Sequence, residues 1–453
     1  MKTLDKVKEI ALAIHAAGGR AMLVGGCVRD KLLNTPVKDY DLEIYNLSAA
    51  QLFAAISNVC EVDAVGMSFG VLKVKHYDID LALPRKENKT GKGHRGFIME
   101  LTPELDFTAA ASRRDFTINA IMMDALTGEI IDPWNGKADL EKKILRHVSA
   151  AFSEDPLRVL RGMQFIARFD LTPDAETVKL CSTISQSELP PERLASEWEK
   201  LLLKGTHLAK ALNFLKETAW VRFYPELAAL INCPQNPQWH PEGDVWNHTL
   251  AVTEAAAKMR KNLNPDDALV FMLAALCHDF GKPSCTVTDA DGKITSCGHD
   301  SMTAPAEKFI TSIWYRKDLP ERVIPLVARH MHPWQLAESS SSNKAFRKLA
   351  LFAKRLDLLA DLAEADVRGI SMSSDERKKR LNTIDIFRRR CEELAIADSV
   401  PKPLILGRHL IKKGLTPGAG FKPILDHCFE AQISGEFSTL PEALDFLDKL
   451  CGK

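Results

Sequence analysis

The sequence predicts an α+β protein, in which a mixed-sheet head at the N-terminus is followed by an all-α remainder. Short β-like runs alternate with helical runs over roughly the first 150 residues, and the pattern is almost wholly helical from about Ser153 onward. A chain of 453 residues with 45% hydrophobic content is long enough for about three domains with cores of their own. The composition therefore indicates a large globular protein.

In the head, we expect a small mixed sheet flanked by helices. An amphipathic helix opens the chain, since lysines interleave with apolar residues there. The predicted strands cover residues 21–24, 41–45, 70–75 and 77–83. The polar stretch 85–94 is rich in Lys, Gly and Asn and is predicted to be a mobile loop.

The first strand enters a turn at Gly25 and Gly26, and an amphipathic helix leaves it. Backbone N–H groups at such a helix N-terminus are open to an anionic triphosphate, and Arg29 lies one turn into the helix. Taken alone, a Gly-Gly pair is also an ordinary tight turn.

Asp39 and Asp41 follow, two residues apart in a β-like segment. The period of a strand places both carboxylates on one face, where two hard oxygen ligands predict a Mg²⁺ site. Asp80 lies in the last predicted strand and is a candidate third carboxylate, although a core-facing or solvent-facing Asp is equally compatible with the pattern. Asp-x-Asp pairs are also common on surfaces.

A second motif runs Arg113-Arg114-Asp115-Phe116-Thr117-Ile118-Asn119-Ala120. Adjacent arginines can hold phosphates, and Asp115 and Asn119, at helical spacing, would share a face and could bind a ribose. A solvated helix start is the alternative.

A third motif is Glu154-Asp155-Pro156-Leu157-Arg158-Val159-Leu160-Arg161. Proline is tolerated in the first helical turn, so a helix is expected to begin here. Asp155 and Arg158 are three apart and can project into one cleft, where acceptor and donor together imitate a Watson-Crick partner for C or A. The alternative is an ion pair within the helix.

Histidines gather in the helical half. Six of the thirteen fall in about a fifth of the chain: His240, His248, His278, His299, His330 and His332. An apolar helix over 268–277 ends in His278-Asp279, with His248 before it and Asp366 well after it, a mixed set of ligands for a hydrolytic divalent metal. Structural histidines that satisfy core polar groups are the alternative reading.

The motifs divide the chain into a head (1–150), a neck and body with the third motif (151–232), a histidine-rich domain (233–370) and a helical tail (371–453). A loop at 339–342 precedes a helix expected from 343 to about 365. In the tail, short helices joined by glycine-rich turns offer backbone amides to RNA phosphates, or form a plain helix hairpin.

The net charge is zero, so any surface for nucleic acid must be a local one. Ten cysteines without a CxxC pair suggest neither a zinc ribbon nor a disulfide framework. Neither a signal-peptide core nor a run of 18 apolar residues occurs, and we expect a cytoplasmic protein without membrane contact.

The combined motifs resemble known families. The strings GGCVRDKLL, VKDYDLE, RRDFTINA and EDPLRVLR resemble the tRNA nucleotidyltransferase branch of the fold shared with DNA polymerase beta, and the ordered His, His-Asp and Asp resemble the HD phosphohydrolase superfamily. The chain is thus similar to class II tRNA nucleotidyltransferases, the CCA-adding enzymes, with a C-terminal HD domain. Gln164 departs from the pattern, because related bacterial sequences often have an arginine there.

The resemblance implies attack of a tRNA 3′-hydroxyl on the α-phosphate of CTP or ATP without a nucleic-acid template. The implied Mg²⁺ ligands and catalytic residues are Asp39 and Asp41, with Asp80 as a candidate third. The implied nucleotide-binding residues are Gly25, Gly26, Arg29, Arg113, Arg114, Asp115, Asn119, Asp155, Arg158 and Arg161. Of these, Asp155 and Arg158 would select the base and Arg161 would reach a phosphate.

For the HD site, the implied ligands of a divalent transition metal are His248, His278, Asp279 and Asp366, with His299 and His330 as further candidates. The HD site would hydrolyse phosphoester ends such as 2′,3′-cyclic or 2′-phosphates. The tail is a candidate tRNA contact.

Rival activities remain open at this point. A bacterial poly(A) polymerase tends to carry basic residues after the glycine before the third strand, whereas Gly66 is followed here by Met67-Ser68-Phe69. Residues 85–112 leave room for the flexible loop that switching from C to A requires, which disfavours a CC-only enzyme. An A-adding enzyme and an HD phosphatase with an inactive RNA-binding head are the other candidates, and the sequence leaves the oligomeric state open.

Overall fold

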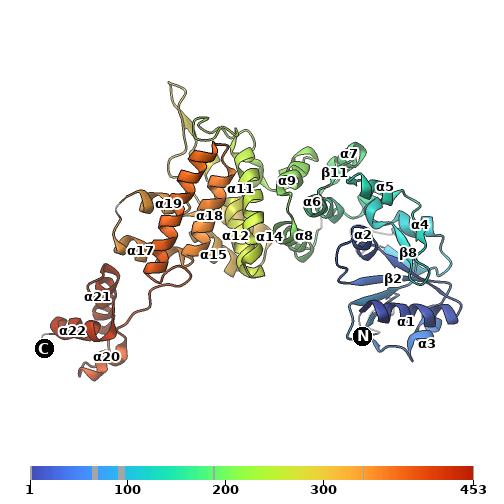
Figure 1. The fold of residues 1–453 in the computed structure, drawn as a ribbon, viewed down its shortest axis with the longest axis horizontal. Helices are drawn as coiled ribbons and strands as arrows, with labels where there is room; N and C mark the ends of the chain where they lie inside the picture. The colour runs from blue at the N-terminus through green and yellow to red at the C-terminus, as the bar shows by residue number, and fades with distance from the viewer. Residues whose placement is uncertain (1–2, 64–69, 90–96, 187–188, 340, 452–453) are drawn as a thin grey trace. The chain divides into compact units, whose positions relative to one another are not determined.

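The computed structural model describes residues 3–63, 70–89, 97–186, 189–339 and 341–451 (Figure 1). The protein divides into two compact units. The first unit comprises Met1–Leu201 and Lys210–Phe223, and the second comprises Leu202–Ala209 and Tyr224–Lys453. Each unit has cores of its own. The finer division at residues 150, 232 and 370 stays a prediction.

The head contains, among the described residues, a seven-stranded sheet of order β3-β4-β5-β2-β1-β8-β9. Its strands are β1 (Arg20–Val24), β2 (Tyr40–Tyr45), β3 (Val62–Asp63), β4 (Val71–Val74), β5 (Ile79–Ala82), β8 (Met122–Asp124) and β9 (Ile130–Ile131). Only the β2–β5 pair is parallel among these seven strands. The predicted mixed sheet and the four predicted strands are confirmed.

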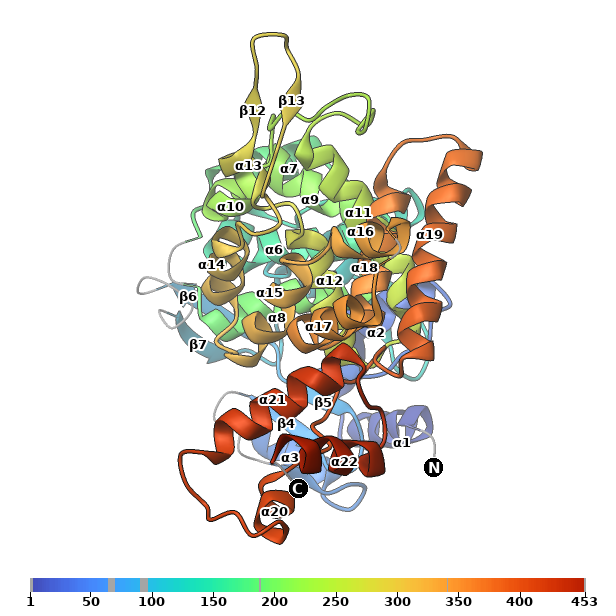
Figure 2. The same cartoon turned by 90° about the vertical axis from the view of Figure 1, so that its left-hand side faces the viewer.

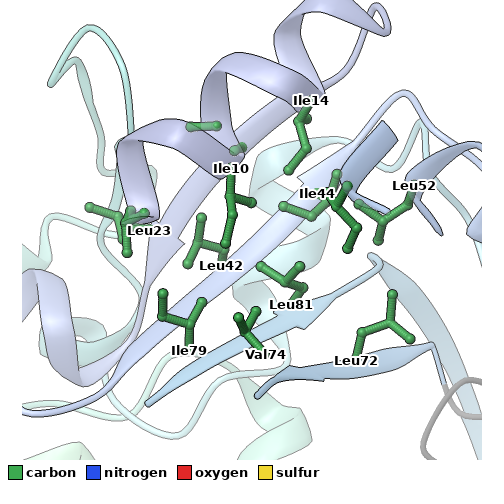
Figure 3. Close-up of a cluster of buried hydrophobic side chains, with 14 of the residues drawn as sticks. Ile10, Ile14, Leu23, Leu42, Ile44, Leu52, Leu72, Val74, Ile79 and Leu81 are labelled. Carbon is green, nitrogen blue, oxygen red and sulfur yellow. The ribbon is translucent and has the colours of Figure 1, made fainter. Parts of the chain in front are cut away.

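Two helices, α1 (Thr3–Ala16) and α3 (Ala49–Ile56), pack on one face of this sheet around a large apolar core (Figure 3). Alternate residues of β2 and β5, such as Leu42 and Leu81, point into that core. Their neighbours Asp41 and Asp80 therefore belong to the opposite face, as the two-residue period of a strand requires.

The predicted loop at 85–94 is wrong for its first half. Residues Arg85–Lys89 form β6, which pairs antiparallel with β7 (Phe97–Leu101) in a separate two-stranded sheet. A polar sequence forms a strand here because its backbone groups pair with those of β7. Residues 90–94 lie outside the described part of the chain.

The rest of the first unit is mostly helical and carries the second and third motifs. It contains α2 (Gly26–Leu32), α4 (Phe107–Ser112), η2 (Thr117–Asn119), α5 (Gly136–Glu141), β10 (Ile144–Leu145), η3 (Ala150–Glu154), α6 (Leu157–Phe169), β11 (Thr172–Pro173), α7 (Ala175–Thr183), α8 (Pro191–Lys204), α9 (Leu208–Glu217) and η4 (Trp220–Phe223), with α8 and α9 running across the boundary. The helix predicted near Pro156 is α6, which begins at the following residue.

Helices α11 (Val245–Met259), α12 (Pro265–Cys277), α18 (Leu356–Gly369) and α19 (Ser374–Glu393) pack side by side at the centre of the second unit (Figure 1). Every residue of α12 from Ala268 to Cys277 is buried, as its continuous apolar sequence predicts. The other elements are α10 (Pro225–Ala228), η5 (Arg260–Asn262), α13 (Lys282–Cys285), β12 (Val287–Thr288), β13 (Ile294–Thr295), α14 (Ala304–Ile313), α15 (Asp318–Val327), α16 (His332–Glu338) and α17 (Asn343–Ala353). Figure 2 shows β12 and β13 as a ribbon that extends beyond α13.

The single helix predicted over 343–365 is wrong, because α17 ends at Ala353 and α18 begins at Leu356. Lys354 between them has a φ of 63°, a left-handed conformation that interrupts a helix. The tail forms α20 (Gly407–Lys412), α21 (Phe421–Ser434) and α22 (Leu440–Leu450) around a small core of its own. None of the helices among the described residues is both long and apolar enough to span a membrane.

We predict that Leu81→Ala destabilises the head by about 3 kcal/mol, because it removes a side chain with no exposed surface from the core on β5. The matched control is Leu12→Ala on α1, whose side chain is 59% exposed and whose loss should cost no more than about 0.5 kcal/mol. Chemical denaturation of the full chain measures both. Equal destabilisation at the two positions would contradict the assigned core.

Candidate functional site

The carboxylates of Asp39, Asp41 and Asp80 gather at one end of the β2–β5 pair. Asp41 and Asp80 are partners in the parallel register, and Asp39 lies just before β2, two residues from Asp41. Partial desolvation raises the pKa of Asp41, and the nearby negative charges of Asp39 and Asp80 raise it further. Three carboxylates that repel one another in this way are a donor set that a divalent cation would stabilise.

The Gly-Gly turn lies against these carboxylates. Gly25 has a φ of 72°, which L-residues rarely adopt, and a Cβ there would lie 3.3 Å from Nη1 of Arg114 and 3.9 Å from Oδ2 of Asp41. Gly26 is the first residue of α2, so the predicted helix begins within the Gly-Gly pair. The backbone of this turn, which has no side chain, therefore faces both the guanidinium group of Arg114 and the carboxylate of Asp41.

Glu43 was not among the residues singled out in the sequence, yet it positions both adjacent arginines. Its carboxylate is buried, 3.0 Å from Nη2 of Arg113 and 3.5 Å from Nη2 of Arg114, and it accepts a hydrogen bond from the Tyr45 hydroxyl. A buried carboxylate needs such partners. The signal was present in the sequence, because Glu43 continues the alternation of Asp39 and Asp41.

Asp115 and Asn119 are in contact, but not on an α-helix as expected. Asp115 precedes the short 3₁₀ turn η2, and Nδ2 of Asn119 donates to its carboxylate across 3.0 Å. The same carboxylate accepts from Nε of Arg161 at 2.7 Å, and Arg29 donates to Asn119 at 2.7 Å. The positive charge of Arg161 and these hydrogen bonds lower the pKa of Asp115 although burial opposes ionisation.

This network occupies four residues predicted to bind nucleotide, namely Arg29, Asp115, Asn119 and Arg161. Each has a protein partner, and the guanidinium groups of Arg29 and Arg161 also lie 5.3 Å from the ring of Phe165. The structure thus ties the second motif to α2 and α6. Binding of ribose or phosphate by these residues stays a prediction.

Asp155 and Arg158, the predicted base-selecting pair, lie close to one another without a direct ion pair between them in the described structure. Asp155 accepts from Nη2 of Arg193 at 2.8 Å, while Arg158 donates to the carbonyl oxygens of Ala151 and Arg113. Burial lowers the pKa of Arg158, and the charges of Asp115 and Asp155 oppose this. The intrahelical ion pair considered as an alternative is therefore not formed.

In the second unit, residues far apart in sequence meet around one carboxylate. His248 comes from the first turn of α11, His278 and Asp279 follow α12, and Asp366 lies in the last turn of α18. The first group is His248, His278 and Asp366, whose potential ligand atoms lie within 4.8 Å of one another. Asp279, His299 and His330 form a second such group.

Asp279 belongs to the second group and also lies next to the histidines of the first. Its Oδ2 is 3.2 Å from Nε2 of His278 and 3.7 Å from Nε2 of His248, while its Oδ1 is 3.4 Å from Nε2 of His299 and 4.0 Å from Nε2 of His330. One carboxylate therefore presents an oxygen to each group. The four predicted ligands and both further candidates are brought together.

The other ring nitrogen of each histidine has a partner that orients it. Nδ1 of His278, His299 and His330 lies within 2.9 Å of a backbone carbonyl oxygen, to which it donates. Nδ1 of His248 is 2.8 Å from Oε1 of Glu242. Each Nε2 is thereby directed to the centre, an arrangement typical of metal ligands.

The pKa shifts differ within the cluster. Burial disfavours the charged form of His248, but hydrogen bonds to Asp366 and Glu242 raise its pKa to about 9. Burial opposes the ionisation of Asp279, but the positive charges of His278 and Lys282 hold its pKa well below the usual range. Burial lowers the pKa of His330 to about 4, which keeps this imidazole neutral. Oδ1 of Asp279 is buried without a hydrogen bond among the described residues, whereas Oδ2 of Asp279 pairs with Lys282 and Oδ1 of Asp366 lies 3.0 Å from Nε2 of His248. A buried carboxylate oxygen without a hydrogen bond fits a bound cation.

Glu242 and Lys282 complete the site and were missed as functional residues. Oε1 of Glu242 bridges His240 and His248, and Nζ of Lys282 lies 2.7 Å from Oδ2 of Asp279. Lys282 follows the His-Asp pair by one helical turn, so its sequence position was a usable signal. Glu242 had no such signal, because it lies in an irregular segment before α11.

Gly281 has a steric role beside the pair. A Cβ at this position would overlap the carbonyl oxygen of His299 and contact that of Met302 at 2.8 Å. The segment carrying His299 can approach Asp279 only because residue 281 has no side chain.

Comparison with known proteins matches both sites to families. The Poly A polymerase head domain family matches residues 21–146, and the HD domain family matches residues 245–366. The Multifunctional CCA protein of Actinobacillus pleuropneumoniae serotype 5b is 36% identical over 361 residues, which cover 77% of this chain and 85% of that protein. The protein of the same name from Stenotrophomonas maltophilia strain R551-3 is 40% identical over 267 residues, which cover 57% of this chain and 63% of that protein.

Solved structures share the fold. The Bacillus stearothermophilus CCA-adding enzyme in complex with CTP aligns with a TM-score of 0.61 at 21% identity, covering 100% of this chain and 98% of that one. The Thermotoga maritima CCA-adding enzyme complexed with tRNA aligns with a TM-score of 0.60 at 15% identity, covering 99% of this chain and 95% of that one.

The fold and the two sites define a protein that joins a head of the poly A polymerase type to an HD domain. Within that class, the chain belongs to the family of multifunctional CCA proteins.

We predict that Glu242→Ala weakens the binding of Co²⁺ to the full chain about 10- to 100-fold, because the imidazole of His248 loses the partner of its Nδ1. Calorimetric titration of the metal-free protein with Co²⁺ measures the affinity. Glu338→Ala is the control, since Glu338 lines the same cavity without contacting these histidines in the described structure. Unchanged Co²⁺ affinity in Glu242→Ala would refute the orienting role.

Proposed function

We propose that this chain adds C, C and A to the 3′ end of tRNA, using CTP and ATP, and that its HD domain hydrolyses phosphoesters. One observation carries the proposal of nucleotide addition. Asp41 and Asp80 are partners on adjacent strands, beside the Gly25 turn and Arg114. The family relatives support it by name, as multifunctional CCA proteins.

Asp39, Asp41 and Asp80 would hold Mg²⁺, for which hard carboxylate oxygens are suitable ligands. Bound there, Mg²⁺ lowers the pKa of an attacking hydroxyl and offsets charge on the phosphoryl group. The backbone at Gly25 and Gly26 approaches the triphosphate without a side chain in the way.

Arg113 and Arg114 would complement the charge of the triphosphate. Glu43 holds both guanidinium groups through Nη2, and the buried Nε of Arg114 has no hydrogen-bond partner among the described residues. The Arg114 side chain as a whole is 21% exposed, so its guanidinium group can reach a phosphate oxygen.

Base selection would use Asp155 and Arg158 on the α6 side of the head. Arg193 holds the Asp155 side chain, and two backbone carbonyl oxygens hold that of Arg158. The two side chains are therefore fixed in position and can act as a template in place of a nucleic acid. A carboxylate acceptor and a guanidinium donor together match the Watson-Crick edges of C and A. The contact of the tail with tRNA stays a prediction.

The HD site would hold a divalent transition metal, because most of its donors are imidazole nitrogens. His248, His278, Asp279 and Asp366 would hold one ion, and Asp279, His299 and His330 a second. The metal supplies Lewis acidity for phosphoester hydrolysis. Lys282 stays paired with Asp279 and keeps that carboxylate ionised.

The deciding experiment incubates the purified chain with tRNA that ends at the discriminator base and with labelled CTP, ATP or both. Growth by CCA followed by arrest is expected. Arrest after CC, addition of A only to tRNA ending in CC, or an unbounded A tail would replace the proposal with a CC-adding, an A-adding or a poly(A)-forming enzyme. A lack of extension beside an active control enzyme would leave the HD phosphatase with an inactive head.

We predict that the double variant Asp39→Ala/Asp41→Ala loses nucleotide addition by at least about 10³-fold, because removal of two oxygen ligands abolishes the Mg²⁺ site. Its hydrolysis of 2′,3′-cyclic phosphates is expected to be unchanged. The reciprocal variant His278→Ala should keep nucleotide addition and lose hydrolysis. Primer extension and phosphate release measure the two activities. Loss of both activities in either variant would contradict the assignment of two separate sites.

A further inference from the structure

The histidine cluster opens into a cavity much larger than a phosphate group. The cavity measures about 670 Å³, and Asp279, His299, His330 and Asp366 line its inner part. Cavities of a few hundred Å³ take ligands of nucleotide size, whereas a lone phosphate occupies a small fraction of this volume. The outer part of the cavity therefore has room for a part of the ligand other than the phosphate group at the metal ligands.

Aromatic side chains line that outer part. Trp239 and Trp334 both face the cavity, and Trp239 is 55% exposed. Trp239 lies on a short turn, where its backbone N–H donates to the carbonyl oxygen of Asn236 at 3.1 Å. A tryptophan with more than half its surface in water, on a hydrogen-bonded turn at a cavity, offers a flat face for stacking.

One face of α19 forms the adjoining wall. Glu376, Lys379, Arg380 and Thr383 line the cavity, and their spacing of three and four residues is that of a single helix face. The guanidinium of Arg380 lies 5.9 Å from the Trp239 ring centroid.

The charge of this wall favours an anion. Nε of Arg380 is 3.0 Å from Oε1 of Glu376, which orients the guanidinium and balances one charge. Lys379 is exposed and has no ion pair in the described part of the chain, and Lys293, just before β13, adds another cation. Glu338 is the remaining acidic residue in this outer lining.

We propose that the outer part of the cavity is a nucleotide subsite, in which Trp239 stacks on the base and Lys379 with Arg380 binds the phosphate on the 5′ side. The inference rests on the proposed phosphohydrolase site, because the metal cluster would hold the phosphoester that is cleaved. The ligand is then a nucleoside with a phosphate at its 2′ or 3′ position and another at its 5′ position. A free nucleoside bisphosphate and the end of an RNA chain share this chemistry.

The test compares ligands that add one feature at a time. Glycerol 2-phosphate has a phosphoester only, adenosine 2′-phosphate adds the base, and adenosine 2′,5′-bisphosphate adds the 5′ phosphate. The metal-loaded full chain is assayed for kcat and KM with each ligand, and dissociation constants are measured by calorimetry. The dinucleotide ApA with a terminal 2′-phosphate distinguishes an RNA end from a free bisphosphate.

Two pairs of variants separate the groups. Trp239→Ala should raise KM for adenosine 2′-phosphate about tenfold or more, leave kcat unchanged and leave glycerol 2-phosphate unaffected, and Trp239→Phe should restore most of the loss. Lys379→Ala should remove the advantage of the bisphosphate over the 2′-phosphate. Lys378→Ala is its control, because Lys378 is an exposed neighbour that does not line the cavity.

The outcomes separate the subsite from the hydrolysis. Equal losses with glycerol 2-phosphate and adenosine 2′-phosphate in Trp239→Ala, or wild-type affinity for every ligand in Trp239→Ala and Lys379→Ala, would overturn the subsite. A wild-type chain that hydrolyses none of these ligands but binds the bisphosphate through Trp239 and Lys379 would contradict the proposed hydrolysis and support the subsite.

Discussion

The two-residue alternation of β2 is the constraint on which the head depends. Leu42 and Ile44 point into the core with α1, so Asp39, Asp41 and Glu43 belong to the other face. Burial of the leucine and isoleucine side chains stabilises the strand by about 2–3 kcal/mol each, and a one-residue slip would exchange the two sets. The apolar core therefore holds the carboxylates at the Gly25 turn.

Buried polar groups in the head show how the remaining motifs are connected. Asp115 accepts from Asn119 and from Arg161, and Glu43 receives both arginines of the second motif. A buried carboxylate without such partners would be strongly unfavourable, so these contacts fix the relative positions of η2, α6 and the sheet. Several motif residues thus support the site through one another.

In the second unit, buried imidazoles are likewise held in place by hydrogen-bond partners. The Nδ1 of each candidate ligand histidine is occupied by a carbonyl oxygen or by Glu242, and Asp279 remains ionised because of the positive charges of His278 and Lys282. The packed helices α11, α12 and α18 hold these groups close together. Imidazole and carboxylate donors gathered in this way suit a metal ion, which is the physical link between the fold and its proposed chemistry.

The sequence by itself determined the elements whose signals are local. The period of the apolar residues predicted β1, β2, β4, β5 and α12, since such patterns depend on neighbours along the chain. The order of the motifs predicted residues for both candidate sites. Local sequence failed at Lys354, where one expected helix is two, and in residues 85–89, where a polar run pairs with a distant strand.

Only the tertiary structure decided which distant groups meet. It placed Glu43 between Arg113 and Arg114, and Glu242 against His248. It also brought Trp239 beside Arg380 of α19, more than a hundred residues away along the chain. No local period encodes such contacts, because they arise when helices and strands pack to bury apolar surface and satisfy buried charge.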